Sequence, residues 1–220
     1  ISQAGMFYPA WLFYGCLSIA LSEITMLELK RLSGEALNQF IPELARLRIE
    51  VFRDFPYLYD GDPDYEARYL QTYIEAPDSV IVLAFDGDKV VGASTGIPLR
   101  YETDEVKAPF IKAGIDVDSV FYCGESVLLS QYRGKGAGVA FFEHREQHAQ
   151  ELGGYEFSCF CGVQRPEDHP RRPSGYKPLD NFWRRRGYEK HPELNTTFSW
   201  KELDEEHESP KPMTFWMKKL

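Results

Sequence analysis

The chain contains 220 residues, 43% of them hydrophobic and 15% aromatic, which suits one α/β domain with a sizeable core. Its net charge of −9 argues against a nucleic-acid partner, because proteins that bind a phosphate backbone present a basic surface. An acidic surface is also compatible with a cationic small substrate.

The first part of the chain is apolar and differs from the rest. Residues 6–21 carry no charge, but the stretch is shorter than a membrane span, contains Pro9 and Gly15, and lacks the basic start of a signal peptide. We therefore expect residues 1–25 to be an appendage that packs on the surface or at a homodimer contact, with no membrane partner. The domain itself is expected over residues 26–220.

Hydrophobic periodicity gives the order of elements in the first half of the domain. We expect a strand at 26–32, a helix from Ser33 to Val51, a helix at 65–75, strands at 79–85 and 89–98, and a helical insertion at 102–112. Asp86, Gly87 and Asp88 suit the tight turn of a hairpin between the two central strands.

The second half of the domain follows the same reasoning. We expect a strand at 120–129, a helix with an apolar stripe of Val139, Phe142, Ala149 and Leu152, a strand at 155–163, an irregular loop at 164–178, and strands at 196–203 and 212–220. One mixed sheet with helices on both faces accounts for this order.

Cysteine and histidine spacings indicate no metal site. Cys16, Cys123, Cys159 and Cys161 lack the spacing of a metal knuckle, so we expect reduced core thiols in a cytoplasmic protein. His144 and His148 flank Glu146, but their order does not match His-Glu-x-x-His and fits a solvated helix face better.

The most informative run is Arg133-Gly134-Lys135-Gly136-Ala137-Gly138, between a strand and a helix. Its glycines let the backbone approach a ligand, and the N–H groups that begin the helix favour an anion, so the expected ligand carries phosphate. The run fails the Walker A pattern, and Val139 stands where a dinucleotide fingerprint needs its third glycine.

The run does match R-x-x-G-x-G, through Arg133, Gly136 and Gly138, and this resembles the pyrophosphate loop of the GNAT superfamily of N-acetyltransferases. A second match, Q-x-x-G-x-G, begins at Gln131. Downstream, residues 181–188 resemble the family's F-Y-x-x-x-G-F segment, a short helix that ends at a glycine.

The resemblance implies a single GNAT-like domain with a mixed, mostly antiparallel sheet of about six to seven strands flanked by helices on both faces. It implies direct transfer of an acetyl group from acetyl-CoA to a primary amine of a small molecule or peptide, without a metal. The alternative is a non-catalytic acyl-CoA-binding or sensing domain on the same fold.

The resemblance also implies which residues bind the donor. Backbone N–H groups of the loop hold the pyrophosphate, and the end of the preceding strand pairs with the pantetheine arm. The residues are Arg133, Gly134, Lys135, Gly136, Ala137 and Gly138 for the loop and Ser126, Val127 and Leu128 for the strand. Leu128 occupies the position whose N–H points at the thioester carbonyl.

The general base has two candidate positions. Glu125 is the only carboxylate in the strand that feeds the loop, and an apolar setting can make it a proton acceptor. Family members that use a strand glutamate place it at the position of Tyr122, and in a regular strand Glu125 would face the opposite side. Glu125 can instead be a structural carboxylate held by backbone or by an arginine.

The general acid is also open, because Trp183 stands where many family members have a tyrosine and indole is no useful proton donor. Tyr176 and Tyr188 are substitute hydroxyls, and water is the remaining donor. Among Arg184, Arg185 and Arg186, at most one is expected to meet a CoA phosphate.

The acceptor cleft is expected between the loop after the first helix and the proline-rich loop at 164–178. Tyrosines suit such a wall, and the candidates are Tyr57, Tyr59, Tyr101 and Tyr176. Two charge patterns remain open: Asp60, Glu102 and Glu125 would attract a cationic amine, whereas His169, Arg171 and Arg172 would bind a carboxylate.

Overall fold

Eight strands form one mixed sheet in the computed structural model, which describes residues 27–220. The sheet order is β1 (Glu28–Leu32), β2 (Val80–Asp86), β3 (Lys89–Pro98), β4 (Val120–Tyr122), β6 (Phe157–Val163), β8 (Ser209–Lys219) and β7 (Glu189–Trp200), with β5 (Ser126–Leu128) paired to β3. Only the β4–β6 pairing is parallel among these strands. The predicted mixed, mostly antiparallel sheet is confirmed, and the appendage predicted at 1–25 lies outside the described residues.

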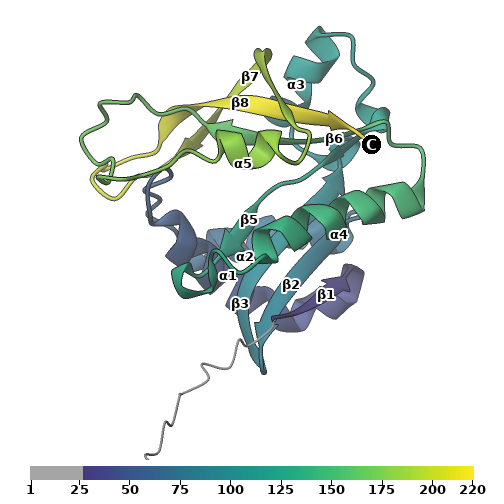
Figure 1. Cartoon of the computed structure of the whole chain (residues 1–220), viewed down its shortest axis with the longest axis horizontal. Helices are drawn as coiled ribbons and strands as arrows, with labels where there is room; N and C mark the ends of the chain where they lie inside the picture. The colour runs from purple at the N-terminus through teal and green to yellow at the C-terminus, as the bar shows by residue number, and fades with distance from the viewer. Residues whose placement is uncertain (1–26) are drawn as a thin grey trace, which may run out of the picture.

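Helices cover both faces of the sheet, as predicted (Figure 1). One face carries α1 (Ile41–Phe52), α2 (Pro63–Glu75) and α3 (Asp104–Lys112), and the other carries α4 (Ala137–Leu152) and α5 (Asp180–Arg184). Phe110 of α3 meets Phe215 with ring centroids 4.8 Å apart, whereas Phe142 of α4 meets Phe160 on the opposite face at 5.7 Å. Alternate residues of the central strands therefore supply two apolar layers.

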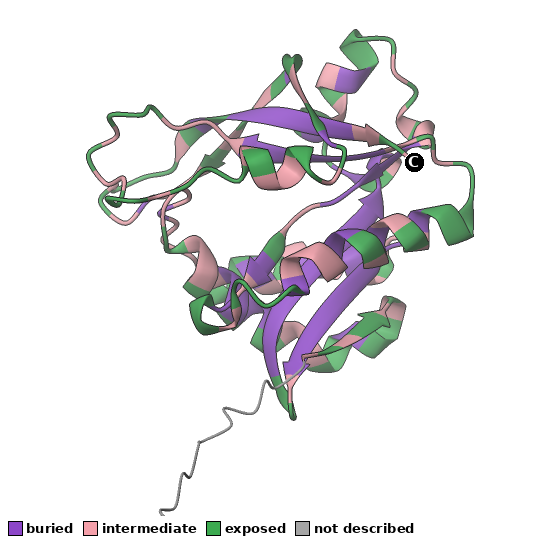
Figure 2. Ribbon diagram, in the orientation of Figure 1, coloured by how far each residue is buried: buried purple, intermediate pink, exposed green. Residues whose placement is uncertain are grey.

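Local chemistry fixes several element ends. The Asp62 side chain accepts a hydrogen bond from the Tyr65 N–H at 2.7 Å, and Pro63 stands at the first helical position, so α2 begins where the sequence supplies a cap. The centre of the sheet is apolar on both faces, and β2 and β3 are buried almost throughout (Figure 2). These strands form the rigid base beneath the functional residues.

The first helix and the last strand pair differ from their predicted extents. Residues Gly34–Phe40 form a 3₁₀ helix before α1 begins at Ile41, where Pro42 sits at the start of the α-helix. The strand predicted at 196–203 begins already at Glu189, and a bulge between His191 and Asn195 masks its alternation.

The buried face of α4 was predicted only in part. Its buried residues are Ala137, Phe141, Phe142, Arg145 and Ala149, whereas Val139 is only half-buried and Leu152 is 41% exposed. The error arises because a buried arginine interrupts the apolar periodicity. Arg145 donates to the carbonyl oxygen of Glu125 at 3.1 Å, beneath a break in the strand above.

Candidate functional site

A break in the strand predicted at 120–129 leaves an opening between β5 and β6, which we call the notch. β4 pairs in parallel with β6 through Tyr122 and Cys159, and the Cys123 N–H donates to the Cys159 carbonyl oxygen at 2.7 Å. Beyond this point β5 pairs with β3, while the second half of β6 pairs with β8. β5 and β6 therefore diverge and leave facing edges unpaired among the described residues (Figure 1).

The backbone of β5 presents alternate groups to this notch. Thr95 donates its N–H to the Glu125 carbonyl oxygen, and Leu129 donates to the Val91 carbonyl oxygen, both at 3.0 Å. Alternation along an antiparallel pair then directs the backbone of Val127 to β3, and the N–H and C=O groups of Ser126 and Leu128 into the notch. Of the three strand residues predicted to pair with a donor, two have backbone groups available for it.

The glycine-rich loop follows directly and begins α4. Gly134 and Gly136 have φ values of +78° and +94°, a region that favours glycine, and an added Cβ would meet nothing within 4 Å at either. No backbone acceptor within 27–220 pairs with the N–H groups of Gly134, Lys135 or Gly136, and the helix start leaves the N–H groups of Ala137 and Gly138 without helical partners. The loop is therefore an open cradle of N–H donors.

Side chains attach the loop to its surroundings. The Tyr132 hydroxyl donates to Asp86 at 2.6 Å, which fixes the loop to the β2–β3 hairpin. Arg133 donates from Nε to the Leu128 carbonyl oxygen at 3.0 Å. The predicted donor-binding residues thus form one continuous surface from Ser126 to Gly138.

Glu125 lies in a buried cluster of charged groups between β5 and helices α1 and α2. Its carboxylate is 2.6 Å from Nη1 of Arg48 and accepts a hydrogen bond from the Tyr69 hydroxyl at 3.0 Å. Arg48 also binds Glu66 through Nε, so one guanidinium serves two carboxylates. The arginine partner considered from the sequence is therefore present.

The expectation that Glu125 and Tyr122 face opposite sides was wrong. Glu125 contacts Arg48 of α1 and Tyr69 of α2, and the Tyr122 ring packs on Phe215, which meets α3 on the same face. The break at 123–125 removes the two-residue alternation that the expectation assumed. Gly124 allows this path, since a Cβ there would collide with the Tyr73 hydroxyl. The break thus brings Tyr122 and Glu125 to the same face.

Glu102 extends the cluster and was not singled out as a proton-transfer residue from the sequence. It is 9% exposed, and the Tyr73 hydroxyl lies 3.4 Å from its Oε1. Burial raises the pKa of the Glu102 carboxyl to about 7, and the charge of Glu125 adds to the increase. Its position in a charged stretch gave no sign of burial, because the stretch reads as a solvated helix.

Three further tyrosines are on the acceptor side: Tyr57 and Tyr122 are close enough to the cluster to feel its charges, and Tyr176 packs against Phe55. The Tyr122 hydroxyl is 3.2 Å from Sγ of Cys161, and burial raises the pKa of Tyr122. Burial also raises the pKa of Tyr57, and the charges of Cys161, Glu125 and Tyr176 contribute. The three hydroxyls therefore remain protonated near neutral pH.

Tyr59 and Tyr101 lie elsewhere. Tyr59 is beside Glu66, behind Arg48, where burial and the charge of Glu66 raise its pKa. Tyr101 is 38% exposed and lies under the Arg100 guanidinium, close to Tyr155 before the start of β6, at the paired end of β4 and β6. The structure does not bring Tyr101 to the notch.

The aromatic residues of the second motif pack against the opposite face of the sheet. The Trp183 ring meets Phe160 and Trp216, each with centroids 5.0 Å apart. The Tyr188 hydroxyl is 2.7 Å from the Ser158 hydroxyl and 3.0 Å from Glu146, and the residue is 1% exposed. Tyr188 therefore has no free hydroxyl for the notch.

The charged residues predicted at the acceptor cleft have partners within the chain. Asp60 pairs with Lys201 at 2.9 Å, and Arg171 pairs with Asp204 at 2.7 Å. Arg172 lies over the Tyr176 ring at 5.3 Å. Asp60 and Arg171 are therefore neutralised by partners, whereas Arg172 forms no ion pair among residues 27–220.

Arg165 connects the segments on the acceptor side. Its guanidinium donates to the carbonyl oxygens of Pro56 and Tyr57 at 2.7 and 3.2 Å, and pairs with Glu202 at 2.6 Å. The Trp200 indole N–H donates to the same Tyr57 carbonyl oxygen at 3.0 Å. We call Arg165, Glu202 and Trp200 the clasp, because they join the α1–α2 loop, the loop after β6 and the β7–β8 turn.

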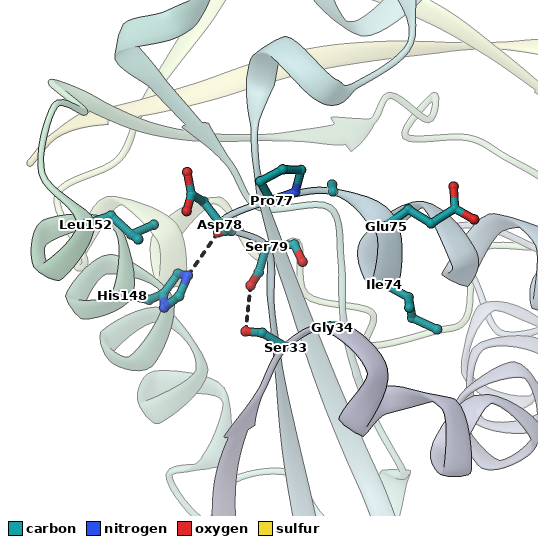
Figure 3. A pocket seen from close by; sticks show the side chains of 10 residues that line it. Ser33, Gly34, Ile74, Glu75, Pro77, Asp78, Ser79, His148 and Leu152 are labelled. Carbon is teal, nitrogen blue, oxygen red and sulfur yellow. Dashed lines mark hydrogen bonds between the residues drawn. The ribbon is translucent and has the colours of Figure 1, made fainter.

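A separate hollow of about 430 Å³ lies between the end of α2 and the end of α4 (Figure 3). His148 hydrogen-bonds the Asp78 carbonyl oxygen there at 2.9 Å, and Ser33 donates to the Ser79 carbonyl oxygen at 2.7 Å. Within residues 27–220, no group of three or more His, Cys, Asp or Glu side chains is arranged to hold a metal ion.

Comparisons with known proteins agree on one family and fold. The model described as "Acetyltransferase (GNAT) family" matches residues 44–173. A ribosomal-protein-alanine N-acetyltransferase from Brucella melitensis aligns with TM-score 0.58 at 13% identity, over 88% of this chain and 100% of its own. Arabidopsis thaliana NAA60 in complex with acetyl-CoA aligns with TM-score 0.59 at 11% identity, over 89% and 99%.

An acetyltransferase from Thermus thermophilus aligns with TM-score 0.52 at 15% identity, over 89% of this chain and 97% of its own. No curated protein matches the sequence. Among the described helices, none has both the length and the apolar character needed to cross a bilayer.

Proposed function

The chain belongs to the GNAT acetyltransferase family, and from this premise we propose that it transfers an acetyl group from acetyl-CoA to a primary amine of a small molecule or peptide. The observation that carries the proposal is the free edge of β5, which leads through one short 3₁₀ helix at Ser130–Tyr132 to the open N–H cradle at the start of α4. A strand edge suits an extended amide-bearing arm, and a helix start suits a pyrophosphate.

The donor would lie along this surface. In the proposal, the N–H groups of residues 134–138 hold the pyrophosphate, while Ser126 and Leu128 hydrogen-bond the pantetheine amides. The Leu128 N–H then stabilises the oxyanion that forms when the thioester carbonyl is attacked. Val127 supports this arrangement through β3 and its buried side chain.

The acceptor would enter from the side of Tyr57, Tyr122 and Glu125. Glu125 takes one proton from the ammonium form of the acceptor, and the freed lone pair attacks the thioester carbon. A C–N bond forms and the C–S bond then breaks, so the sulfur leaves with its electron pair. The second amine proton passes to the thiolate, and Glu125 returns its proton to solvent.

This proton balance requires no tyrosine at the position of Trp183. Tyr176 is half-buried, with its ring 4.7 Å from Phe55, and is the available hydroxyl on the acceptor side. We propose that Tyr176 delivers the proton to the thiolate by exchange with the amine. Tyr122 shapes the pocket and holds Cys161.

The charge balance of the cluster favours a cationic acceptor. Among residues 27–220, Arg48 is the one cation in direct contact with the carboxylates of Glu66 and Glu125, and Glu102 adds a further acidic group. One similar structure is a ribosomal-protein-alanine N-acetyltransferase, and another, Arabidopsis thaliana NAA60, is in complex with a bisubstrate analogue, so peptide amines are among the acceptors to be tested. Cys123, Cys159 and Cys161 are free and buried, which supports a cytoplasmic location.

A thiol-release screen tests the proposal. Purified full-length chain and acetyl-CoA are incubated with amino acids, polyamines, aminoglycosides and peptides with free N-termini, and CoA release is compared with enzyme-free controls. We expect at least one amine to release CoA with formation of the acetylated amine. CoA binding by calorimetry without turnover across the panel would indicate an acyl-CoA-binding domain instead.

A further inference from the structure

Four oxygen-bearing side chains form a continuous buried chain from β5 to the start of α3. The Tyr69 hydroxyl is 3.0 Å from Glu125 Oε2 and 3.0 Å from the Tyr73 hydroxyl, which is 3.4 Å from Glu102 Oε1. Glu125, next to β5, lies at one end of this chain, and Glu102, before α3, lies at the other. The two carboxyl groups are thus connected by two hydroxyl groups.

Counting hydrogens shows that this chain needs a proton on a carboxyl group. Three oxygen–oxygen contacts require three hydrogens, and the two tyrosine hydroxyls supply two. Arg48 contacts Glu125 directly, whereas no cation within residues 27–220 forms an ion pair with Glu102. The third hydrogen is therefore least costly on Glu102, whose other oxygen accepts from the Thr103 N–H.

The surroundings of Glu102 place its titration near neutral pH. Burial is the largest cause of the raised pKa of about 7, and the charge of Glu125 adds to it. The titratable groups that face Glu102 come from every neighbouring element: Tyr73 of α2, Lys107 of α3, Tyr122 of β4, Cys159 and Cys161 of β6, and Glu125. Of these, only Lys107 opposes the shift by charge.

We infer that Glu102 is a positioning residue that sets the strength of Glu125 as the base, through the hydroxyl chain of Tyr73 and Tyr69. With a hydrogen on Glu102, Tyr73 donates to Tyr69 and Tyr69 donates to Glu125. When Glu102 loses the hydrogen, the Tyr73 hydroxyl donates to Glu102 instead of to Tyr69. The single hydrogen of the Tyr69 hydroxyl is then shared between Tyr73 and Glu125. Loss of a donor and gain of a nearby negative charge both make Glu125 a stronger base.

This inference rests on the proposed acetyl transfer, and a pH profile tests it. With saturating acetyl-CoA and the panel amine that turns over fastest, wild-type kcat should rise between about pH 6 and about pH 8.5. Glu102→Gln keeps the donated hydrogen at every pH, so it should match the wild type at the lower pH and lag roughly three- to tenfold at the higher. The exposed neighbour Glu105→Gln is the matched control and should follow the wild type.

Two results would overturn the inference. A Glu102→Gln profile parallel to the wild type would show that Glu102 does not act through Glu125, and an equal loss at every pH would show a purely structural role. If Glu102→Gln does not fold, Tyr73→Phe interrupts the same chain of hydroxyl groups and should reduce the rise of kcat between about pH 6 and about pH 8.5. A Tyr73→Phe profile identical to the wild type would overturn the inference equally.

An infrared titration separates this inference from the proposed function, because it needs no acceptor. The wild type should show the C=O stretching band of a protonated carboxyl group that disappears near pH 7, and Glu102→Gln should lack it while Glu105→Gln retains it. Absence of the band in the wild type would refute the third hydrogen. Absence of turnover with any amine, with the band present, would refute only the proposed acetyl transfer.

Discussion

At the scale of single residues, Arg48 is the most consequential side chain outside the notch. Its side chain is 10% exposed and pairs with Glu66 and Glu125, whose side chains are 0% and 7% exposed. Arg48→Met should lower the free energy of unfolding by about 3–5 kcal/mol, because two buried carboxylates lose their cation. Urea denaturation measures this.

Arg46 provides the control for Arg48. It lies on the same helix and pairs with Glu50, but both side chains are about half exposed. Arg46→Met should therefore change the free energy of unfolding by less than about 0.5 kcal/mol. Similar losses in the two variants would contradict the importance of the buried cluster.

Glu102 also gives the stability a pH dependence. Its pKa is about 7 in the folded protein against 4.5 as the ordinary value, so the folded state binds the proton more tightly. The resulting stabilisation is present below about pH 4.5 and is lost as the pH rises through about 7. Relative to the wild type, Glu102→Gln should gain up to about 3 kcal/mol of unfolding free energy between about pH 4.5 and about pH 8.

Equilibrium denaturation of the two proteins across this pH range measures the difference. A constant offset between them would mean that Glu102 binds its proton equally in the folded and unfolded states, so that folding does not raise its pKa. Other groups titrate in both proteins, so their contributions cancel in the difference between the two free energies of unfolding.

At the scale of elements, sequence patterns located the notch better than the cluster behind it. The glycine run and the helix start follow from local residues, so the loop that begins α4 could be predicted. The partners of Glu125 could not, because Arg48 and Tyr69 belong to helices remote in sequence. The break at Gly124 was also hidden, since it depends on contact with Tyr73.

The start of α4 carries a direct prediction about the donor. Gly136→Trp places a large side chain at φ +94° in the N–H cradle, so CoA binding should weaken at least about tenfold in calorimetry. Gly153→Trp is the matched control, because Gly153 also has a positive φ and open space, but at the opposite end of α4. Unchanged CoA affinity in Gly136→Trp would remove the donor from this loop.

At the scale of the whole molecule, the clasp holds the acceptor side together from three distant segments. Among the described residues, Arg165→Met should leave Glu202 with the longer ion pair to Lys211 at 3.6 Å, and it should remove one of the two hydrogen bonds to the Tyr57 carbonyl oxygen. We expect KM for the acceptor to rise roughly tenfold, with KM for acetyl-CoA changed by less than about twofold. Steady-state kinetics with each substrate varied in turn measures this.

Lys190→Met is the control for the clasp. Lys190 contacts Gln164, the neighbour of Arg165, at 3.0 Å, but it does not touch the α1–α2 loop. Its kinetic constants should stay close to those of the wild type. A rise in both KM values of Arg165→Met would instead indicate general loosening of the fold.

The alternating backbone of β5 has a consequence for amide hydrogen exchange. In the free protein the Val127 amide, bonded to β3, should exchange slowly, while the amides of Ser126 and Leu128, which face the notch, should exchange quickly. Acetyl-CoA laid along this edge would act as a further strand and slow those two amides selectively, which exchange-resolved NMR can follow residue by residue. Uniform slowing of exchange along β5 would mean that the ligand only tightens the sheet. Slowing of the Ser126 and Leu128 amides alone would remove the fast–slow alternation and would trace the path of the pantetheine arm across the notch between β5 and β6.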